Sequence, residues 1–186
     1  MADVWLVRHA ETEWSVARKH TGRTDLPLTE RGRTAATALR ERLAGHEFTR
    51  VFASPLRRAR DTATLAGFGE RIETRDELLE WDYGEYEGIT TKEIHGRRPD
   101  WFLWHHGAPG GESPDDVRAR CDRLIAELVE VQGDVLCVAH GHILRALGAR
   151  WLQRPLDLGG QLPLETGSVS VLGFERSQRA LERWNG

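Results

Sequence analysis

The sequence is short of cysteine, of lysine and of long apolar runs, and each shortage excludes a class of protein. The two cysteines, Cys121 and Cys137, fall within apolar patterns typical of a core, so we expect neither a disulfide framework nor a cysteine metal site. No segment approaches the roughly 20 apolar residues of a membrane span, and Asp3 and Arg8 bound the apolar run nearest the N-terminus. Without a signal peptide or a span, we expect a cytoplasmic protein with no membrane partner.

Basic and acidic residues nearly balance, so charge alone points to no partner. The chain has 26 Lys and Arg against 29 Asp and Glu, a net charge of -3. Only Lys19 and Lys92 are lysines, a skew that a coding bias explains better than a nucleic-acid partner does. A chain of 186 residues buries roughly 70% of its unfolded surface. We therefore expect residues 1–186 to form one domain around one core.

Short apolar runs alternate with longer helical patterns, and no Ser-rich or Pro-rich linker divides them. This alternation predicts a single-domain α/β fold in which a mostly parallel central sheet is flanked by helices. Strands are expected over residues 4–8, 51–53, 135–139 and 168–174, the last paired with 180–184. Helices are expected from Thr29 to Gly45, from an N-cap at Ser54 toward Gly67, from Thr90, from Ser113 to near Gly133, and over residues 142–152.

Two of the expected strands end in the same way. Arg8-His9 follows the first strand, and Ala139-His140 follows the strand over residues 135–139. In an open parallel sheet, ligands bind beyond the carboxyl ends of the strands. If these two strands are neighbours, His9 and His140 meet at that edge.

An arginine pair at the start of an expected helix is a candidate anion site. Arg57 and Arg58 follow Ser54-Pro55, and a helix N-terminus already favours anions. Adjacent helical residues point about 100 degrees apart, so only one of the two arginines can face the crevice. The alternative is a solvated basic face in an arginine-rich chain.

Four carboxylates compete for a possible acid role in the segment after residue 79. They are Glu80, Asp82, Glu85 and Glu87, interleaved with aromatic residues and glycines. A partly desolvated carboxyl group can act as an acid catalyst. The residue pattern alone does not choose among the four.

Residues 6–12, Leu-Val-Arg-His-Ala-Glu-Thr, resemble the signature of the histidine phosphatase superfamily, the phosphoglycerate mutase-like fold, which usually reads Arg-His-Gly-Glu-Thr. Five further blocks are similar to blocks of that family and occur in the family's order: residues 21–29, 54–59, 80–88, 110–113 and 139–142. Together they span most of the chain, and their joint occurrence is specific.

The resemblance assigns chemistry to five residues. It implies that His9 is the nucleophile and forms a phosphohistidine, which requires a neutral imidazole whose other nitrogen is held by an acceptor. Arg8, Arg58 and His140 match the family's phosphate pocket, where they would hold the phosphoryl oxygens. Glu80 matches the position that protonates the leaving alkoxide and then activates water.

The same resemblance implies further positions in the phosphate or substrate pocket: Ser15, Thr21, Gly22, Gly141 and His142. Two positions depart from the family pattern. Ala10 replaces the usual Gly, and Ser15 stands where many relatives have Asn, which shortens one expected phosphate contact.

Hydrolysis is expected rather than mutase transfer. About 30 residues separate Glu80 from Ser113, enough for two short helices but short for the lid that shields the phosphoenzyme of a mutase from water. A phosphoglycerate mutase-type phosphotransferase is the alternative activity.

The blocks around residues 80–84 and 139–142 look closest to a subgroup of acid phosphatases and sedoheptulose bisphosphatase. A second anion site for a sugar bisphosphate would draw on Lys92, Arg97, Arg98, His105, His106 and His142. The opposite interpretation, in which Lys92 and Arg97 only coat the helix after Thr90, is equally open. Trp101 and Trp104 are interpreted as wall or core packing.

Two other classes of protein compete with the phosphatase. A metallohydrolase would use His140 and His142, whose two-residue spacing suits one face of a strand, but a helix starting at Gly141 would make them diverge. A non-catalytic phosphate-binding module would have lost part of the chemistry, which the sequence retains. We therefore expect no metal and no cofactor, a small phosphorylated substrate as partner, no nucleic-acid partner, and a homodimer.

Overall fold

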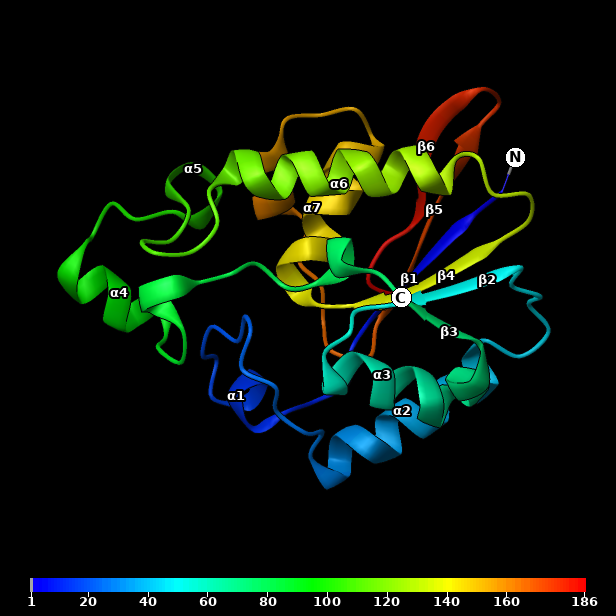
Figure 1. Cartoon of the computed structure of the whole chain (residues 1–186), viewed down its shortest axis with the longest axis horizontal. Helices are drawn as coiled ribbons and strands as arrows, with labels where there is room; N and C mark the ends of the chain where they lie inside the picture. The colour runs from blue at the N-terminus through cyan, green and yellow to red at the C-terminus, as the bar shows by residue number, and fades with distance from the viewer. Residues whose placement is uncertain (1) are drawn as a thin grey trace.

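Six strands form one sheet in the order β3-β2-β4-β1-β5-β6 (Figure 1). In the computed structural model, which describes residues 2–186, the strands are β1 (Val4–Arg8), β2 (Arg50–Ala53), β3 (Ile72–Thr74), β4 (Val135–Ala139), β5 (Val169–Glu175) and β6 (Gln178–Arg183). The first four strands pair in parallel, whereas β5 is antiparallel to β1 and to β6. The expected single-domain, mostly parallel sheet is confirmed.

Helices cover both faces of this sheet. They are α1 (Glu13–Val16), α2 (Glu30–Arg42), α3 (Arg57–Ala63), α4 (Thr91–Arg97), α5 (Leu103–His106), α6 (Pro114–Leu128) and α7 (Gly141–Trp151). Figure 1 shows α6 and α7 over one face, α2 and α3 over the other, and α1, α4 and α5 at one end of the molecule. Within residues 2–186, no helix is long and apolar enough to cross a membrane.

The alternation of side chains along β1 explains why both faces are covered. Val4 and Leu6 belong to the large core under α6 and α7, whereas Trp5 and Val7 belong to a second core under α2 and α3. Successive side chains of a strand point to opposite faces, so a strand that is apolar at every position requires a layer on each side.

Helix starts follow the polar caps that the sequence indicates. The Thr29 hydroxyl accepts the N–H of Gly32 at 2.9 Å, and Thr90 and Ser113 each form a capping box with the acidic residue three positions later. The segment between Glu80 and Ser113 contains the two short helices α4 and α5, as expected.

The expected N-cap at Ser54 is wrong. α3 begins only at Arg57, with Leu56 at the N-cap and no side-chain cap. The Ser54 hydroxyl accepts the Leu56 N–H at 3.3 Å and lies 2.7 Å from Nε2 of His140. It is therefore used to hold a histidine of the neighbouring strand, which local capping rules do not reveal.

Other boundaries differ by a few residues. α6 ends at Leu128, before the turn in which Gly133 adopts a φ of +88°, and α7 starts at Gly141. The hairpin pairs residues 169–175 with 178–183. Strand β3 was not expected, because three half-buried or exposed residues at a sheet edge carry almost no apolar pattern.

Candidate active site

The two histidines meet at the carboxyl edge of the sheet. β1 and β4 are parallel neighbours with Arg8 opposite Ala139, so the residue after each strand emerges at the same edge. The ring centroids of His9 and His140 are 5.1 Å apart. The expectation drawn from the two strand ends is confirmed.

The imidazole of His9 is held in one tautomer. Its Nδ1 lies 2.8 Å from the carbonyl oxygen of Ala10, which can only accept, so Nδ1 carries the proton and Nε2 keeps its lone pair. Burial, with the charges of Arg58 and Arg8, holds the pKa of His9 well below its usual range. The ring is therefore neutral and has the protonation state that a nucleophile requires.

Arg8 places a positive charge beside this ring and has an N–H group without a hydrogen-bond partner among the described residues. Its Nη1 donates to the carbonyl of Leu164, while its Nε is buried and has no hydrogen-bond partner among residues 2–186. A buried unpaired donor costs free energy, so it marks a place where an acceptor is expected. A Cβ at Gly141 would lie 3.3 Å from both Nε and Cζ of Arg8, so the small residue lets the guanidinium lie against α7.

Of the two adjacent arginines, only Arg58 points inward. It is fully buried, and its Nη atoms donate to the carbonyls of Thr21 and Thr24 at 3.0 and 2.8 Å and to that of Gly22 at 2.9 Å. Arg57 is exposed and pairs with Asp61 along the helix. Arg58 therefore ties the loop over residues 21–24 to the site.

His140 is held from two sides. Nδ1 accepts a hydrogen bond from Nε of Arg58 at 3.0 Å, so the neutral ring carries its proton on Nε2, which donates to the Ser54 hydroxyl. Burial, then the charge of Arg58, keeps the pKa of His140 well below its usual range. The ring is thus a neutral, fixed neighbour of His9.

Glu80 is the acid that the fold brings to the histidines. Its Oε1 accepts the N–H groups of Trp81 and Ile143, both at 2.9 Å, and its Oε2 accepts that of His142 at 3.0 Å. The carboxyl group therefore caps the N-terminus of α7, directly after His140. Oε2 has the fewer hydrogen-bond partners of the two oxygens.

The other three carboxylates of this segment, Asp82, Glu85 and Glu87, lie outside the active-site cavity. Asp82 accepts the N–H of Gly84 at 3.0 Å, Glu85 is exposed, and Glu87 holds the loop over residues 21–24. Among the described residues, none of the three lines the cavity that contains His9. Of the four carboxylates, only Glu80 lines this cavity in the part of the chain described.

Glu87 and Gly22 hold the loop over residues 21–24 in place. Glu87 Oε1 accepts the N–H groups of Gly22 and Thr24 at 2.9 and 3.0 Å. A Cβ at Gly22 would lie 2.6 Å from the carbonyl oxygen of Trp81, so only glycine fits between the two segments.

A buried ion pair supports the segment that carries Glu80. Arg120 on α6 donates to both carboxylate oxygens of Glu112, at 2.8 and 2.9 Å, and to the carbonyls of Glu77 and Leu79 at 2.7 Å. The sequence predicted neither role. The Gly-Gly-Glu-Ser block was the available signal for Glu112, whereas Arg120 is one arginine among many on an amphipathic helix.

His9 lines a cavity of about 510 Å³. Of the expected site residues, Arg8, His9, Ser15, Thr21, Glu80, Gly141 and His142 line it. Arg58, His140 and Gly22 are buried behind this lining in the part of the chain described. Residues that were not expected complete the wall: Thr12, Arg18, Lys19, His20, Tyr83, Thr91, Arg145 and Glu165.

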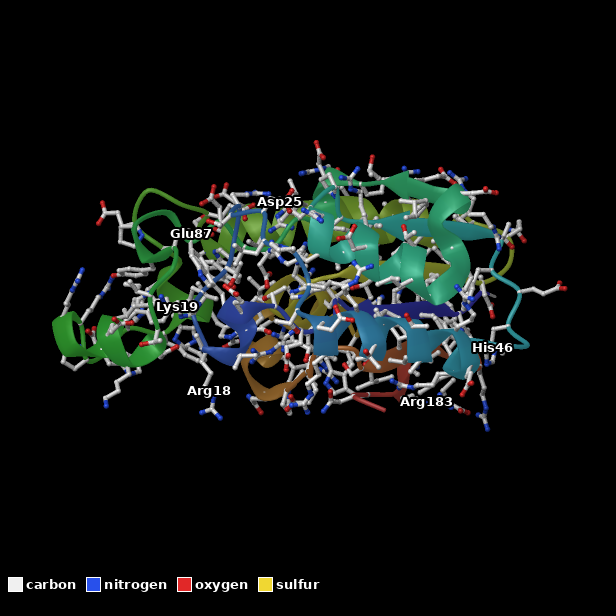
Figure 2. The ribbon with its side chains drawn as sticks, turned by 90° about the horizontal axis from the view of Figure 1, so that it is seen from below. Arg18, Lys19, Asp25, His46, Glu87 and Arg183 are labelled. Carbon is white, nitrogen blue, oxygen red and sulfur yellow. The ribbon has the colours of Figure 1, made fainter. Side chains whose placement is uncertain are left out.

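Arg18 and Lys19 are the exposed cations of this wall. They lie at the same end of the molecule as Glu87 and far from His46, as Figure 2 shows. Neither residue lies in a block that resembles the family, so the sequence did not predict that they line the cavity.

The side chains considered for a second anion site do not gather at the cavity, His142 excepted. Lys92, Arg97, Arg98, His105 and His106 line neither this cavity nor the one beside it in residues 2–186. His105 lies 3.3 Å from Asp157, and Arg98 lies 3.8 Å from Asp100. His142 instead forms a 2.6 Å hydrogen bond between its Nδ1 and the hydroxyl of Tyr83.

The spacing of His140 and His142 does not produce a metal site. α7 starts between them, so their rings bind different partners, and residues 2–186 contain no cluster of three or more His, Cys, Asp or Glu side chains suited to a metal ion.

Comparisons with known proteins identify the family of this chain. Residues 4–186 match the histidine phosphatase superfamily (branch 1). An acid phosphatase of Mycobacterium tuberculosis is 44% identical over 180 residues, covering 95% of this chain and 88% of its own length. Sedoheptulose 1,7-bisphosphatase of Saccharomyces cerevisiae is 35% identical over 193 residues, covering 87% and 70%. The solved structure of an open reading frame product from Mycobacterium tuberculosis superimposes with a TM-score of 0.95 at 41% identity, covering 99% and 97%. The chain therefore belongs to branch 1 of the histidine phosphatase superfamily and is a phosphatase of the histidine type.

Proposed function

We propose that the protein hydrolyses small phosphorylated metabolites through a phosphohistidine on His9, with Glu80 as general acid and base. One observation carries the proposal: the unprotonated Nε2 of His9 belongs to a cavity whose wall also holds the unpaired, buried Nε of Arg8. A nucleophile and an unsatisfied cationic donor side by side fit a phosphoryl group between them.

The phosphoryl oxygens would be held by Arg8, Arg58 and His140. Arg8 offers its unpaired Nε–H. Arg58 uses Nη1 once, on Thr24, and so keeps a further N–H there. The ring centroid of His140 lies 5.1 Å from that of His9, and its Nε2 proton must be exchanged from Ser54 to reach a phosphoryl oxygen. Fixed donors of this kind stabilise charge as it shifts in the transition state.

The first step transfers the phosphoryl group to the enzyme. Nε2 of His9 attacks phosphorus while the bond to the ester oxygen breaks, and Glu80 gives a proton from Oε2 to that oxygen, so that a neutral alcohol leaves. Nδ1 keeps its proton throughout, donated to the Ala10 carbonyl, and this hydrogen bond stabilises the positive charge that the imidazole ring carries in the phosphohistidine.

The second step returns the enzyme to its starting state. Glu80, now a carboxylate, takes a proton from water as the water oxygen attacks phosphorus, and the bond from phosphorus to Nε2 breaks. Inorganic phosphate leaves with Glu80 protonated again. Between Glu80 and α6 lie one 3-10 turn, Gly84–Tyr86, and the two short helices α4 and α5, and the shortness of this segment supports hydrolysis over mutase transfer.

The remaining expected residues would shape the pocket. Ser15, Thr21, Gly141 and His142 line the cavity, and Gly22 supports it from behind. The Ser15 hydroxyl donates to the carbonyl of Thr12 at 2.8 Å, so a direct bond from Ser15 to phosphate requires that this hydrogen bond be exchanged.

Trapping during turnover tests the proposal. A screen of phosphomonoesters with chelator present should give phosphate release, and rapid acid-free quenching should recover a phosphohistidine at residue 9. His9→Ala should abolish both, while His46→Gln, at the far end of the molecule, should change neither. Turnover that persists in His9→Ala would contradict the mechanism.

We also propose that residues 1–186 form one histidine phosphatase domain, that the protein acts in the cytoplasm and that it forms a homodimer. The two free, buried thiols of Cys121 and Cys137 suit a reducing compartment. Sedimentation equilibrium tests the homodimer.

A further inference from the structure

A second cavity adjoins the active site. It measures about 320 Å³ and shares the side chains of His20, Thr91, His142 and Arg145 with the active cavity. Its own wall comes mainly from residues 101–104, Trp-Phe-Leu-Trp, before and within α5. We call this space the aromatic annex.

The annex is lined mainly by aromatic and other uncharged side chains, with one arginine, Arg145. Burial lowers the pKa of His20 to about 4 and keeps that of His142 well below its usual range, so both rings are neutral. Arg145 donates to the carbonyls of Gly159 and Gly160 at 2.8 and 3.1 Å, and its guanidinium lies over the ring of Trp104 at 5.1 Å. Nε and Nη2 of Arg145 are thus used within the protein, whereas no hydrogen bond from Nη1 occurs among residues 2–186.

Phe102 gives the annex aromatic surface that is exposed to solvent. Trp101 and Trp104 are 4% exposed and form the inner wall, whereas Phe102 is 42% exposed on the same wall. A Cβ at Gly160 would lie 2.9 Å from the tip of the Phe102 ring, so this exposed ring is seated against the backbone. An aromatic side chain exposed beside a catalytic cavity marks surface that a ligand can cover.

We propose that the aromatic annex binds an apolar, ring-bearing portion of the leaving alcohol, so that the enzyme prefers aryl or arylalkyl phosphomonoesters. This inference rests on the proposed function, because it assigns the annex to the substrate whose phosphoryl group reacts with His9. Its physical basis is continuity: the two cavities have four lining residues in common, so one molecule can occupy both. A second phosphate would meet a single arginine there, Arg145, whose Nε and Nη2 already donate to backbone carbonyls.

Two substrates with similar alkoxide leaving groups separate binding from chemistry. We expect kcat/KM for 2-phenylethyl phosphate to exceed that for ethyl phosphate by roughly tenfold or more, the value of burying a few apolar carbons. Phe102→Ala should lower this ratio several-fold and leave ethyl phosphate hydrolysis unchanged. Phe102→Leu should restore part of it, and Val16→Ala, an exposed apolar residue on α1 outside both linings, should leave it unchanged.

A binding measurement provides an independent test. 2-Phenylethanol should inhibit ethyl phosphate hydrolysis at concentrations where ethanol does not, and Phe102→Ala should weaken that inhibition. A substrate ratio near one, or a ratio that Phe102→Ala leaves unchanged, would overturn the annex proposal while the phosphatase activity stands. Failure to hydrolyse either ester would instead refute the proposed function.

Discussion

Nε of Arg58 donates a hydrogen bond to Nδ1 of His140 at 3.0 Å, and both side chains are fully buried. This contact couples α3 to the end of β4. It makes Nδ1 of His140 an acceptor, so the ring stays neutral and its Nε2 proton points to Ser54. An arginine expected only to bind phosphate therefore also fixes the tautomer of the second histidine.

Arg58→Lys should fail to replace that function. A lysine ammonium cannot reach His140 and the carbonyls of the 21–24 loop together, because its donors sit on one atom instead of a planar fork. We expect kcat/KM to fall by about 10²-fold or more and the free energy of unfolding to fall by about 2–4 kcal/mol. Phosphate release and chemical denaturation measure the two effects. Arg57→Lys, at the exposed neighbour, is the control and should leave both near native values.

Glu80→Gln should slow hydrolysis most for esters whose leaving group is a strongly basic alkoxide, because such an anion must be protonated as it leaves. For an alkyl phosphate we expect a loss of about 10²–10⁴-fold in kcat, whereas a nitrophenyl phosphate, whose anion leaves unaided, should lose far less in the first step. Burst kinetics with the aryl ester would then show phosphoenzyme accumulating, because water activation is also impaired. Equal losses with both esters would count against Glu80 as the acid.

Gly141→Ala should displace Arg8 without disturbing the helix. The added Cβ would lie 3.3 Å from the guanidinium, closer than ordinary contact, so Arg8 must move by a few tenths of an ångström. We expect kcat/KM to fall by about 10–100-fold, as small misplacements of a catalytic group do.

Gly96→Ala on α4 is the matched control for that change. Its Cβ would meet no atom within 4 Å, so activity should be unchanged and the helix should gain up to about 1 kcal/mol. Equal activity in the two variants would show that the approach of Arg8 to α7 is unimportant.

The buried histidines should make the protein acid-sensitive. Burial lowers the pKa of His9, His20, His140 and His142 in the folded state, so the unfolded chain binds more protons below its ordinary histidine pKa of about 6.5. Stability is therefore fully present above about pH 7 and is lost as the pH falls below 6.5, by up to ~1.4 kcal/mol per histidine per pH unit.

Denaturant unfolding at pH 7.5, 6.5 and 5.5 measures this loss. His20→Gln should reduce the loss by about one quarter, because one of the four neutral rings no longer has to be kept unprotonated. A free energy of unfolding that is constant over this range would contradict the lowered pKa values.

The sequence by itself determined the fold class and the meeting of His9 with His140. The apolar runs of β1 and β4 are short and fully buried, each is followed by a histidine, and parallel pairing leaves one edge at which both can emerge. The helix starts at the polar caps Thr29 and Ser113 could also be predicted from the sequence, because a cap acts within three residues of its own position.

Only the tertiary structure decided which groups surround those histidines. Glu80 reaches the N-terminus of α7 across 62 residues, and Ser54 reaches His140 across 86. Such contacts depend on how layers pack, and any of four neighbouring acids satisfied the local pattern equally well. The same holds for the aromatic annex: the sequence predicted wall or core packing for Trp101 and Trp104, and only the tertiary structure shows that Phe102, between them, is exposed beside the active site.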